Sequence, residues 1–273
     1  MRKLKEYLNK PLSFAVFLLI IISTVITALT VVFIIGYIFI KGVPNLSLDL
    51  FSLKYSSSNQ SMLPSIINTV YLTALTLLLA VPIGIFSAIY LAEYSRKNSF
   101  FVKIINIANE TLSGIPSIVY GLFGFLAFVI SKKWGYSLLA GVITLAIMVL
   151  PLIIRTSQEA MLGVDNTFRE ASYGLGAGKL RTVFKIVLPS AMPGILSGII
   201  LAIGRIVGET AALIYTAGTV PEAATKLTSS SRTISVHLYC LLNEGLYTEQ
   251  AYATAVVLIV FVVIINALSN ALA

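Results

Sequence analysis

The chain has 273 residues, of which 58% are hydrophobic and only 11% are charged. This composition excludes an ordinary soluble domain and predicts an all-α protein that crosses a membrane several times. The net charge of +8 would indicate a nucleic-acid partner only if the basic residues gathered on one soluble face, whereas here they lie between apolar runs. With one cysteine and one histidine, neither an intrachain disulfide nor a metal site nor a histidine-based catalytic triad can be assembled, so we expect no enzyme activity.

Apolar runs of about 17 residues or more, long enough to span a bilayer as helices, recur along the chain. There are six, at residues 12–40, 63–91, 104–130, 138–154, 194–217 and 251–271. The first is too long for the apolar core of a cleavable signal peptide, and we interpret it as a retained signal anchor. We therefore divide the chain into residues 1–62, a basic tail with the first helix and an outer loop, and residues 63–273, a core of five helices.

Lysine and arginine are distributed unevenly between the two ends of these spans. One side receives twelve of them and the other six, and Arg205 lies within a span. By the positive-inside rule, the side with twelve is cytoplasmic. This orientation places both termini and the loop at residues 164–190 in the cytoplasm, so the net charge mostly reports topology.

The loop at residues 164–190 is polar and basic, yet it carries a helical pattern of its own. Thr167 is followed three residues later by Glu170, and this capping box predicts the start of a short helix. Gly174, Gly176 and Gly178 then predict that the helix ends and the chain turns.

A second helix is predicted in the same loop, over residues 179–188, and Pro189 is expected to end it. Its basic residues lie off a face that is apolar at helical spacing. That face consists of Leu180, Val183, Phe184, Val187 and Leu188. A partner protein could bury such a face, and the alternative is a connector that lies on lipid headgroups.

The same loop carries a family resemblance. Glu170-Ala171-Ser172, then Gly176, then Ile186-Val187-Leu188-Pro189 match the spacing E-A-A, three residues, G, nine residues, I-x-L-P, with Ser172 in place of the second alanine. This spacing resembles the coupling loop of the permease subunits of ABC importers. The resemblance implies the type I importer permease fold and a loop that docks into a groove of an ATPase subunit. The candidate ATPase contacts are Glu170, Ala171, Gly176, Leu180, Phe184, Leu188 and Pro189.

The fifth apolar run contains two charged residues. Arg205 lies near its middle, where a charge costs roughly 2.5–3.5 kcal/mol and by default marks a functional residue. Glu209 follows four residues later, so on one helix the two side chains can pair. The pair could serve only to hold the bundle together. Alternatively, Arg205 contacts an oxyanion, for which its planar guanidinium is suited, while Glu209 holds it, tempers its field or switches partners.

Small residues in this run predict close contacts between neighbouring helices. They form two stripes, Gly194, Gly198 and Ala202, and Gly204, Gly208 and Ala212.

Other features receive local interpretations. Pro82 and Gly84 should kink or loosen the second span, and the glycines and proline of residues 114–124 are interpreted as ordinary flexibility of a membrane helix. Glu110 is expected to be an interfacial carboxylate. His237 is expected to pack or hydrogen-bond within a short surface helix at residues 234–242.

Residues 63–273 also resemble the PstA-type permease subunits of bacterial phosphate ABC importers. The resemblance rests on VPIGIFSAIYLAEY at 81–94, GIPSIVYGLFG at 114–124 and GRIVGET at 204–210. It implies that Arg205 and Glu209 act in phosphate passage through the bacterial cytoplasmic (inner) membrane. The partners it implies are a PstC-type sister permease, two PstB-type ATPases, an extracytoplasmic phosphate-binding protein and membrane lipid. ATP and Mg²⁺ would then belong to the ATPases, with no cofactor on this chain.

Three rival functions stay open at this point. The cargo could be sulfate, molybdate or a phosphonate instead of phosphate. An ion gradient could drive a secondary transporter with the two charges as a proton-linked site, although the 164–190 loop argues against it. The chain could also be a membrane scaffold whose buried charges only hold helices together.

Overall fold

The computed structural model describes residues 11–96 and 99–272, and every regular element in these ranges is helical. The basic tail with Arg2, Lys3, Lys5 and Lys10 lies outside them, as does Lys97. The long helices are α2 (Pro11–Gly42), α3 (Leu63–Ile89), α6 (Leu138–Leu162), α9 (Leu188–Val207) and α12 (Thr248–Leu272). The shorter ones are α4 (Phe100–Gly114), α5 (Ser117–Gly124), α7 (Asn166–Gly174), α8 (Lys179–Thr182), α10 (Ala211–Thr216) and α11 (Ile234–Glu244).

Several helices continue through π-helical turns. These are η3 (Tyr90–Tyr94) after α3, η4 (Phe125–Ser131) after α5 and η5 (Val183–Val187) between α8 and α9. Two short 3₁₀ turns, η1 (Val43–Asn45) and η2 (Leu48–Phe51), lie in the outer loop after α2.

The predicted spans are confirmed as candidate membrane helices, but two of them differ in shape from the prediction: the third run is bent, and the fifth is broken after Val207. Five helical stretches in the described ranges are long and apolar enough to cross a membrane, and the pair Phe100–Gly114 and Ser117–Ser131 makes a sixth if the two halves are counted as one span. That pair is bent by 100°, so the third apolar run is not the flexible but continuous helix that we expected. Ile115 is extended (ψ 130°) because the following Pro116 disfavours helical backbone at the residue before it. The two halves therefore run in different directions.

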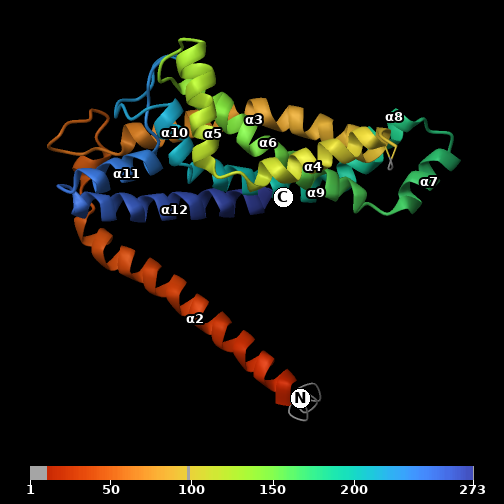
Figure 1. Ribbon diagram of the computed structural model, residues 1–273, viewed down its shortest axis with the longest axis horizontal. Coiled ribbons are helices and arrows are strands. Elements are labelled where there is room, and N and C mark those ends of the chain that lie inside the picture. The colour runs from red at the N-terminus through yellow and green to blue at the C-terminus, as the bar shows by residue number, and fades with distance from the viewer. Residues whose placement is uncertain (1–10, 97–98, 273) are drawn as a thin grey trace.

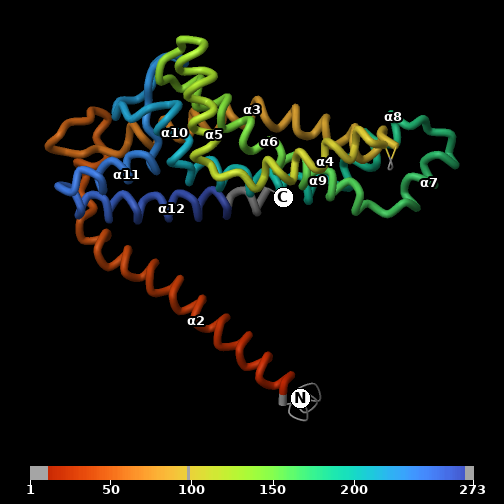
Figure 2. The backbone as a smooth tube through the Cα atoms, viewed as in Figure 1, coloured from red at the N-terminus to blue at the C-terminus, as the bar shows by residue number. Residues whose placement is uncertain are grey.

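Helix α2 leaves the rest of the molecule at an angle, and its N-terminal end lies far from the other helices (Figures 1 and 2). No residue in its apolar window is buried. Its C-terminal end packs on α12, where Gly42 comes against the backbone of Tyr252 and the ring of Tyr37 lies 6.0 Å from that of Tyr252. The division at residue 62 stays a prediction.

Helices α3, α6, α9 and α12 lie lengthwise in the main body (Figure 1). Small residues bring α9 close to α6: a Cβ on Gly194 would lie 2.7 Å from the Cβ of Ala160, and one on Gly198 would collide with Thr156. This contact confirms the first small-residue stripe at those two positions. Gly84 of α3 faces α6 in the same way, where a Cβ would lie 2.6 Å from Ile153. Such backbone proximity is the usual means of helix packing in lipid.

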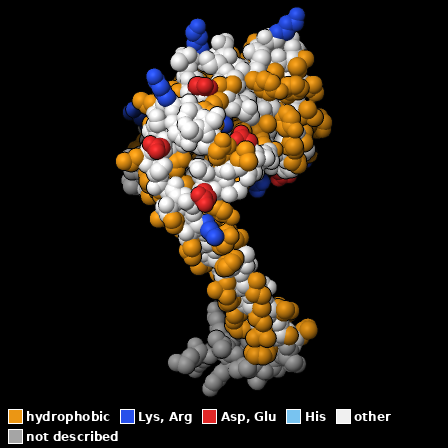
Figure 3. All heavy atoms as spheres, turned by 90° about the vertical axis from the view of Figure 1, so that its left-hand side faces the viewer, with side chains coloured by type: hydrophobic (Ala, Val, Ile, Leu, Met, Phe, Trp, Pro, Cys, Tyr) orange, Lys and Arg blue, Asp and Glu red, His pale blue; other side chains and the backbone are white. Residues whose placement is uncertain are grey.

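The end of the bundle opposite α7 and α8 is closed by α11 and the loops around it. Asn68 of α3 donates to the carbonyls of Glu222 and Arg232 and accepts from the amide of Ala224. These bonds fix the segment between α10 and α11 on the bundle. In Figure 3, which faces this end, Lys, Arg, Asp and Glu side chains are scattered over the surface, whereas α2 is hydrophobic along its length. That contrast fits a polar end in water and an apolar helix in lipid.

Candidate functional site

The first arm of the 164–190 loop is α7, and its start differs from the prediction. Asp165, not Thr167, is the N-cap, and its carboxylate accepts from the Thr167 amide at 2.9 Å. The expected capping box of Thr167 and Glu170 is therefore wrong, because the helix begins before Thr167 and an ionised acceptor precedes it. Hydrogen bonds from the Thr167 amide and hydroxyl lower the pKa of the Asp165 carboxyl.

The predicted glycine turn is confirmed. Helix α7 ends at Gly174, and Gly176 has φ +80°, a left-handed conformation that favours glycine. Across the turn, the hydroxyls of Ser172 and Thr182 are buried and 2.8 Å apart. Ser172, which stands where the family spacing has alanine, thus joins the two arms of the loop.

The second arm is not a separate helix, and Pro189 does not end it. The helical stretch runs without interruption from Lys179 to Val207, with the π-helical turn η5 just before Leu188 and Pro189. Proline has no N–H to donate back into the preceding turn, and a π-helical turn alters the bonding pattern there, so the chain stays helical. The loop is therefore a rigid extension of α9.

The expected apolar face of this arm is divided by the same turn. Val183 and Val187 are fully buried against the ends of α3 and α6, whereas Leu180 and Phe184 are 66% and 39% exposed. Leu188 is partly buried, and the remaining candidate ATPase contacts are exposed: Glu170, Ala171, Gly176 and Pro189.

Three further apolar side chains of the loop are exposed, and the sequence did not single them out. Leu175, next to Gly176 in the turn, is 89% exposed, and Phe168 and Tyr173 of α7 are also exposed. Together with Leu180 and Phe184 they form what we name the loop surface. The family spacing contains none of the three, and only their apolar type in a polar loop could have indicated them.

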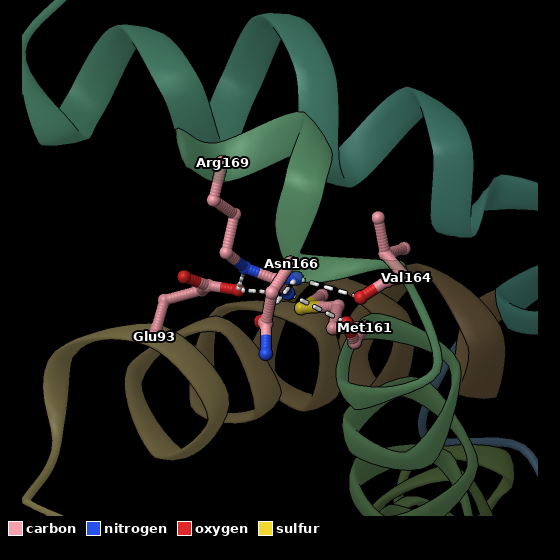
Figure 4. Close-up of polar contacts among 5 residues, drawn as sticks. All are labelled: Glu93, Met161, Val164, Asn166 and Arg169. Atoms are coloured by element: carbon pink, nitrogen blue, oxygen red, sulfur yellow. Dashed lines mark hydrogen bonds and ion pairs between the residues drawn. The ribbon is translucent and has the colours of Figure 1, made fainter. Parts of the chain in front are cut away.

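Arg169 of α7 fastens the loop to the bundle (Figure 4). Its Nη2 and Nε lie 2.7 Å and 3.1 Å from Oε1 of Glu93 in η3. It also donates to the carbonyls of Met161 and Val164 at 2.8 Å and 2.7 Å, at the end of α6. The sequence places Arg169 among the cytoplasmic basic residues without a partner.

The fifth apolar run is broken where continuity was expected. Helix α9 ends at Val207 and α10 begins at Ala211, so Arg205 and Glu209 lie on either side of the end of a helix and not on one face of it. They form no ion pair in the described structure. The expected pairing is therefore wrong.

Each of the two charges instead meets a helix end of complementary polarity. Arg205 lies in the last turn of α9, where the helix dipole is negative. Glu209 is 8% exposed, and its Oε1 accepts from the amide of Ala212 at 3.0 Å in the first turn of α10. The Glu209 carbonyl accepts from the Ser235 hydroxyl at 2.6 Å. Glu209 is thus held by the backbone and by α11, and it leaves Arg205 unneutralised.

Arg205 lines an open pocket of about 830 Å³ between α6, α9 and α12. It is partly buried and forms no hydrogen bond or ion pair with any residue in the part of the chain that the structure describes. The other polar side chains of the pocket are those of Thr156, Glu159, Ser197 and Asn266. The pocket offers one unpaired guanidinium with the hydroxyl and amide groups of Thr156, Ser197 and Asn266, which suit a small anion, while the carboxylate of Glu159 is paired with Arg155.

The second small-residue stripe is confirmed only at its end. A Cβ on Gly204 would meet nothing within 4 Å, because Gly204 lines the pocket. Ala212 does contact a neighbour: a Cβ on Gly121 of α5 would lie 2.7 Å from its Cα. Helix α10, the second part of the broken fifth run, is thus packed against α5, the second part of the bent third run.

Neither Glu110 nor His237 lines this pocket. Glu110 is exposed on α4 and lines a smaller pocket of about 190 Å³ with Arg155 and Glu159. His237 is fully buried in α11, where it packs edge-on against Tyr55, which confirms a packing role. Burial, with a further contribution from the charge of Arg232, lowers the pKa of His237 to about 3, so its imidazole is neutral at physiological pH.

Comparison with known proteins supports a transport role. The family described as "Binding-protein-dependent transport system inner membrane component" matches residues 80–273. The chain is 35% identical to the phosphate transport system permease protein PstA of Pasteurella multocida, over 97% of this chain and 93% of that protein. It is 32% identical to the probable ABC transporter permease protein YqgI of Bacillus subtilis, over 85% of this chain and 84% of that protein.

Solved structures agree with the expected fold. A bacterial ABC transporter that imports the acidic polysaccharide alginate superposes with a TM-score of 0.68 at 18% identity, over 100% of this chain and 98% of that one. The MetNI methionine ABC transporter gives a TM-score of 0.58 at 17% identity, over 77% of this chain and 91% of that one. At such identities the likeness concerns the fold alone, and it confirms the all-α importer permease architecture.

Proposed function

Because the chain belongs to the family of binding-protein-dependent transport system inner membrane components, we propose that it is the transmembrane permease subunit of an ATP-driven importer of inorganic phosphate. The observation that carries this proposal is the 35% identity to a phosphate permease over 97% of the chain. The subunit forms half of the translocation pathway in the bacterial cytoplasmic membrane, with both termini and the 164–190 loop in the cytoplasm.

The proposed assembly contains three kinds of partner. A PstC-type permease supplies the other half of the pathway, two PstB-type ATPases drive it, and an extracytoplasmic phosphate-binding protein delivers the cargo. An alginate ABC transporter has been solved together with its periplasmic protein, which supports this general arrangement. ATP and Mg²⁺ are bound by the ATPases, and this chain holds no cofactor and catalyses no reaction.

The loop surface is the proposed contact with the ATPase. Its five apolar side chains are exposed at the end of the bundle, and burying such a side chain is worth roughly 1.5–3 kcal/mol before the costs of association. Glu170, beside them on α7, is exposed and forms no hydrogen bond or ion pair within the described residues, so its carboxylate is free for the partner. Since the second arm is continuous with α9, ATPase closure would push that helix directly.

Arg205 is the proposed contact for the phosphate ion. A guanidinium without a protein counter-ion, in an open pocket, attracts an oxyanion but does not enclose it. Passage requires such incomplete binding, because a closed site would trap the ion. The role of Glu209 in this proposal is to hold the start of α10 and keep its own charge away from the anion.

Uptake of radiolabelled phosphate tests the proposed cargo. Cells that lack their own high-affinity importer would express this chain with its candidate partners, with unlabelled sulfate or molybdate as competitors. We expect uptake that unlabelled phosphate suppresses and the other two oxyanions do not. Uptake of sulfate or molybdate in place of phosphate would contradict the assignment.

The same cells test Arg205. We expect Arg205→Ala to reach the membrane in normal amount but to lose uptake, and Arg205→Lys to keep part of it because the charge remains without the planar fork. Lys132→Ala is the matched control, since Lys132 is an exposed cation outside the pocket. Equal uptake by Arg205→Ala and the control would show that Arg205 has no part in passage.

A further inference from the structure

The contact between Arg169 and Glu93 is unusual for an exposed polar loop because both side chains are almost fully enclosed. Their side chains are 13% and 6% exposed. The other ion pair in the described structure, Arg155 with Glu159, joins residues of one helix and is 55% and 62% exposed. An exposed pair contributes little, whereas loss of one partner from an enclosed pair leaves an uncompensated charge.

The pair joins three separate elements. Arg169 is on α7, Glu93 is on the π-helical end of α3, and the two carbonyls that Arg169 also binds belong to Met161 and Val164 at the end of α6. The open carbonyls at a helix end are favourable partners for a cation. Arg169 reaches these acceptors from three separate nitrogens, Nε, Nη1 and Nη2, whereas lysine would donate from a single nitrogen and could not reproduce that spread.

The residue after Glu93 holds the other arm of the loop. The Nζ of Lys179, at the start of α8, lies 5.0 Å from the centre of the Tyr94 ring, a cation–π contact. The arms are also joined to each other by the buried hydroxyls of Ser172 and Thr182. Glu93 and Tyr94, consecutive residues of η3, therefore contact the two arms of the loop, and the Ser172–Thr182 hydrogen bond joins those arms to each other.

Beneath these polar contacts lies a shared apolar cluster. Ala88 and Ile89 of α3, Met161 of α6, and Val183 and Val187 of η5 are all buried in it. The cluster packs the loop on the ends of α3 and α6, but apolar contacts are not directional and allow sliding. The directional restraint comes from the ion pair.

From these contacts we infer that Arg169 and Glu93 are positioning residues: their enclosed ion pair locks the 164–190 loop to the end of α3, so that the loop, α3 and α6 move as one body during transport. The inference rests on the proposed function, in which the loop receives the ATPase movement. Without the pair, the loop would still follow the ATPase, but less of that movement would reach the helices that line the pathway.

The test compares transport with ATP hydrolysis in the full reconstituted complex. Glu93→Gln removes the charge and keeps the shape, and Arg169→Lys keeps the charge and loses the fork. Arg155→Lys is the matched control, because it makes the same change in the exposed pair. We expect both loop variants to assemble and hydrolyse ATP, while the phosphate imported per ATP falls by about fivefold or more. The control should keep the wild-type ratio.

A distance measurement separates positioning from simple stabilisation. Nitroxide labels at Arg181→Cys on α8 and Leu78→Cys on α3, both exposed positions, would be placed in a Cys240→Ala background. We expect one narrow distance distribution with and without ATP, and a broadened one in Glu93→Gln. A wild-type import ratio and a narrow distribution in Glu93→Gln would overturn the inference. If the wild-type complex imported no phosphate, the proposed function would fail, and the distance distributions would still decide whether the pair locks the loop.

Discussion

Replacing Gly121 by alanine should loosen the contact between α5 and α10. Gly121 faces Ala212, and an added Cβ would lie 2.7 Å from the Ala212 Cα and 3.2 Å from the Ala211 carbonyl oxygen. Both neighbours are backbone atoms, so no side chain can rotate away. The two broken half-helices must separate instead.

The size of the effect follows from this geometry. Carbon atoms pack best at about 3.5–4.0 Å, so the helices must part by roughly 1 Å, and a gap of that size forfeits a quarter to a half of the dispersion energy of the surrounding contacts. Overpacking of this kind costs about 1–3 kcal/mol. Glu209 and the start of α10 would shift with it, so phosphate uptake should fall as well.

Gly114→Ala is the matched control, since a Cβ there meets nothing within 4 Å and the residue lies in the same bent helix pair. Alanine in place of a helical glycine is favourable by about 0.5–1 kcal/mol. Thermal denaturation of the detergent-purified proteins should therefore place Gly121→Ala below wild type and Gly114→Ala level with it or above. Equal melting temperatures for the two variants would refute the reasoning about this contact.

Three further outcomes are expected. Thr182→Val should destabilise the protein by about 1–3 kcal/mol, because it leaves the buried hydroxyl of Ser172 without its partner. Ser172→Ala should cost about 1 kcal/mol or less, because the Thr182 hydroxyl keeps its bond to the Gly178 carbonyl. The reverse order of melting temperatures would contradict this reasoning. Glu209→Gln should insert and fold normally, since its amide oxygen can still accept from Ala212, whereas Glu209→Leu should cost about 1–2 kcal/mol; equal melts would refute it. The pKa of His237 is about 3 in the folded state and about 6.5 in the unfolded state, so its contribution to the free energy of unfolding is complete above pH 6.5 and falls as the pH drops, by about 2–3 kcal/mol at pH 4.5. His237→Gln should flatten this dependence of stability on pH, and an unchanged pH profile would refute the reasoning.

The spans and the turn of the loop could be predicted because their signals are local. Apolar runs report membrane helices directly, and Gly176 adopts the left-handed conformation that its type favours. The coupling spacing likewise placed Glu170 and its neighbours on an exposed loop.

The break after Val207 could not be predicted, because the local pattern of Arg205 and Glu209 favours a continuous helix. The break is held by tertiary contacts, among them the bond from Ser235, which lies 26 residues beyond Glu209 in the sequence. A pattern read along one helix contains no information about such a bond.

The anchoring role of Arg169 was missed for the same reason. Its partner Glu93 lies 76 residues earlier, and only the fold brings the two together.

The wrong prediction that the helix of the second arm ends at Pro189 has a different cause. Propensity rules assume the α-helical bonding pattern, and the π-helical turn η5 departs from it.

ATP-dependent phosphate uptake by proteoliposomes tests the proposed function most directly. The vesicles would contain this chain with its sister permease and two ATPases, with the phosphate-binding protein outside and ATP within. We predict that labelled phosphate accumulates only when ATP and the binding protein are both present, and that Arg205→Ala abolishes it while ATP hydrolysis continues. Accumulation driven by an ion gradient without ATP, or full uptake by Arg205→Ala, would contradict the proposal.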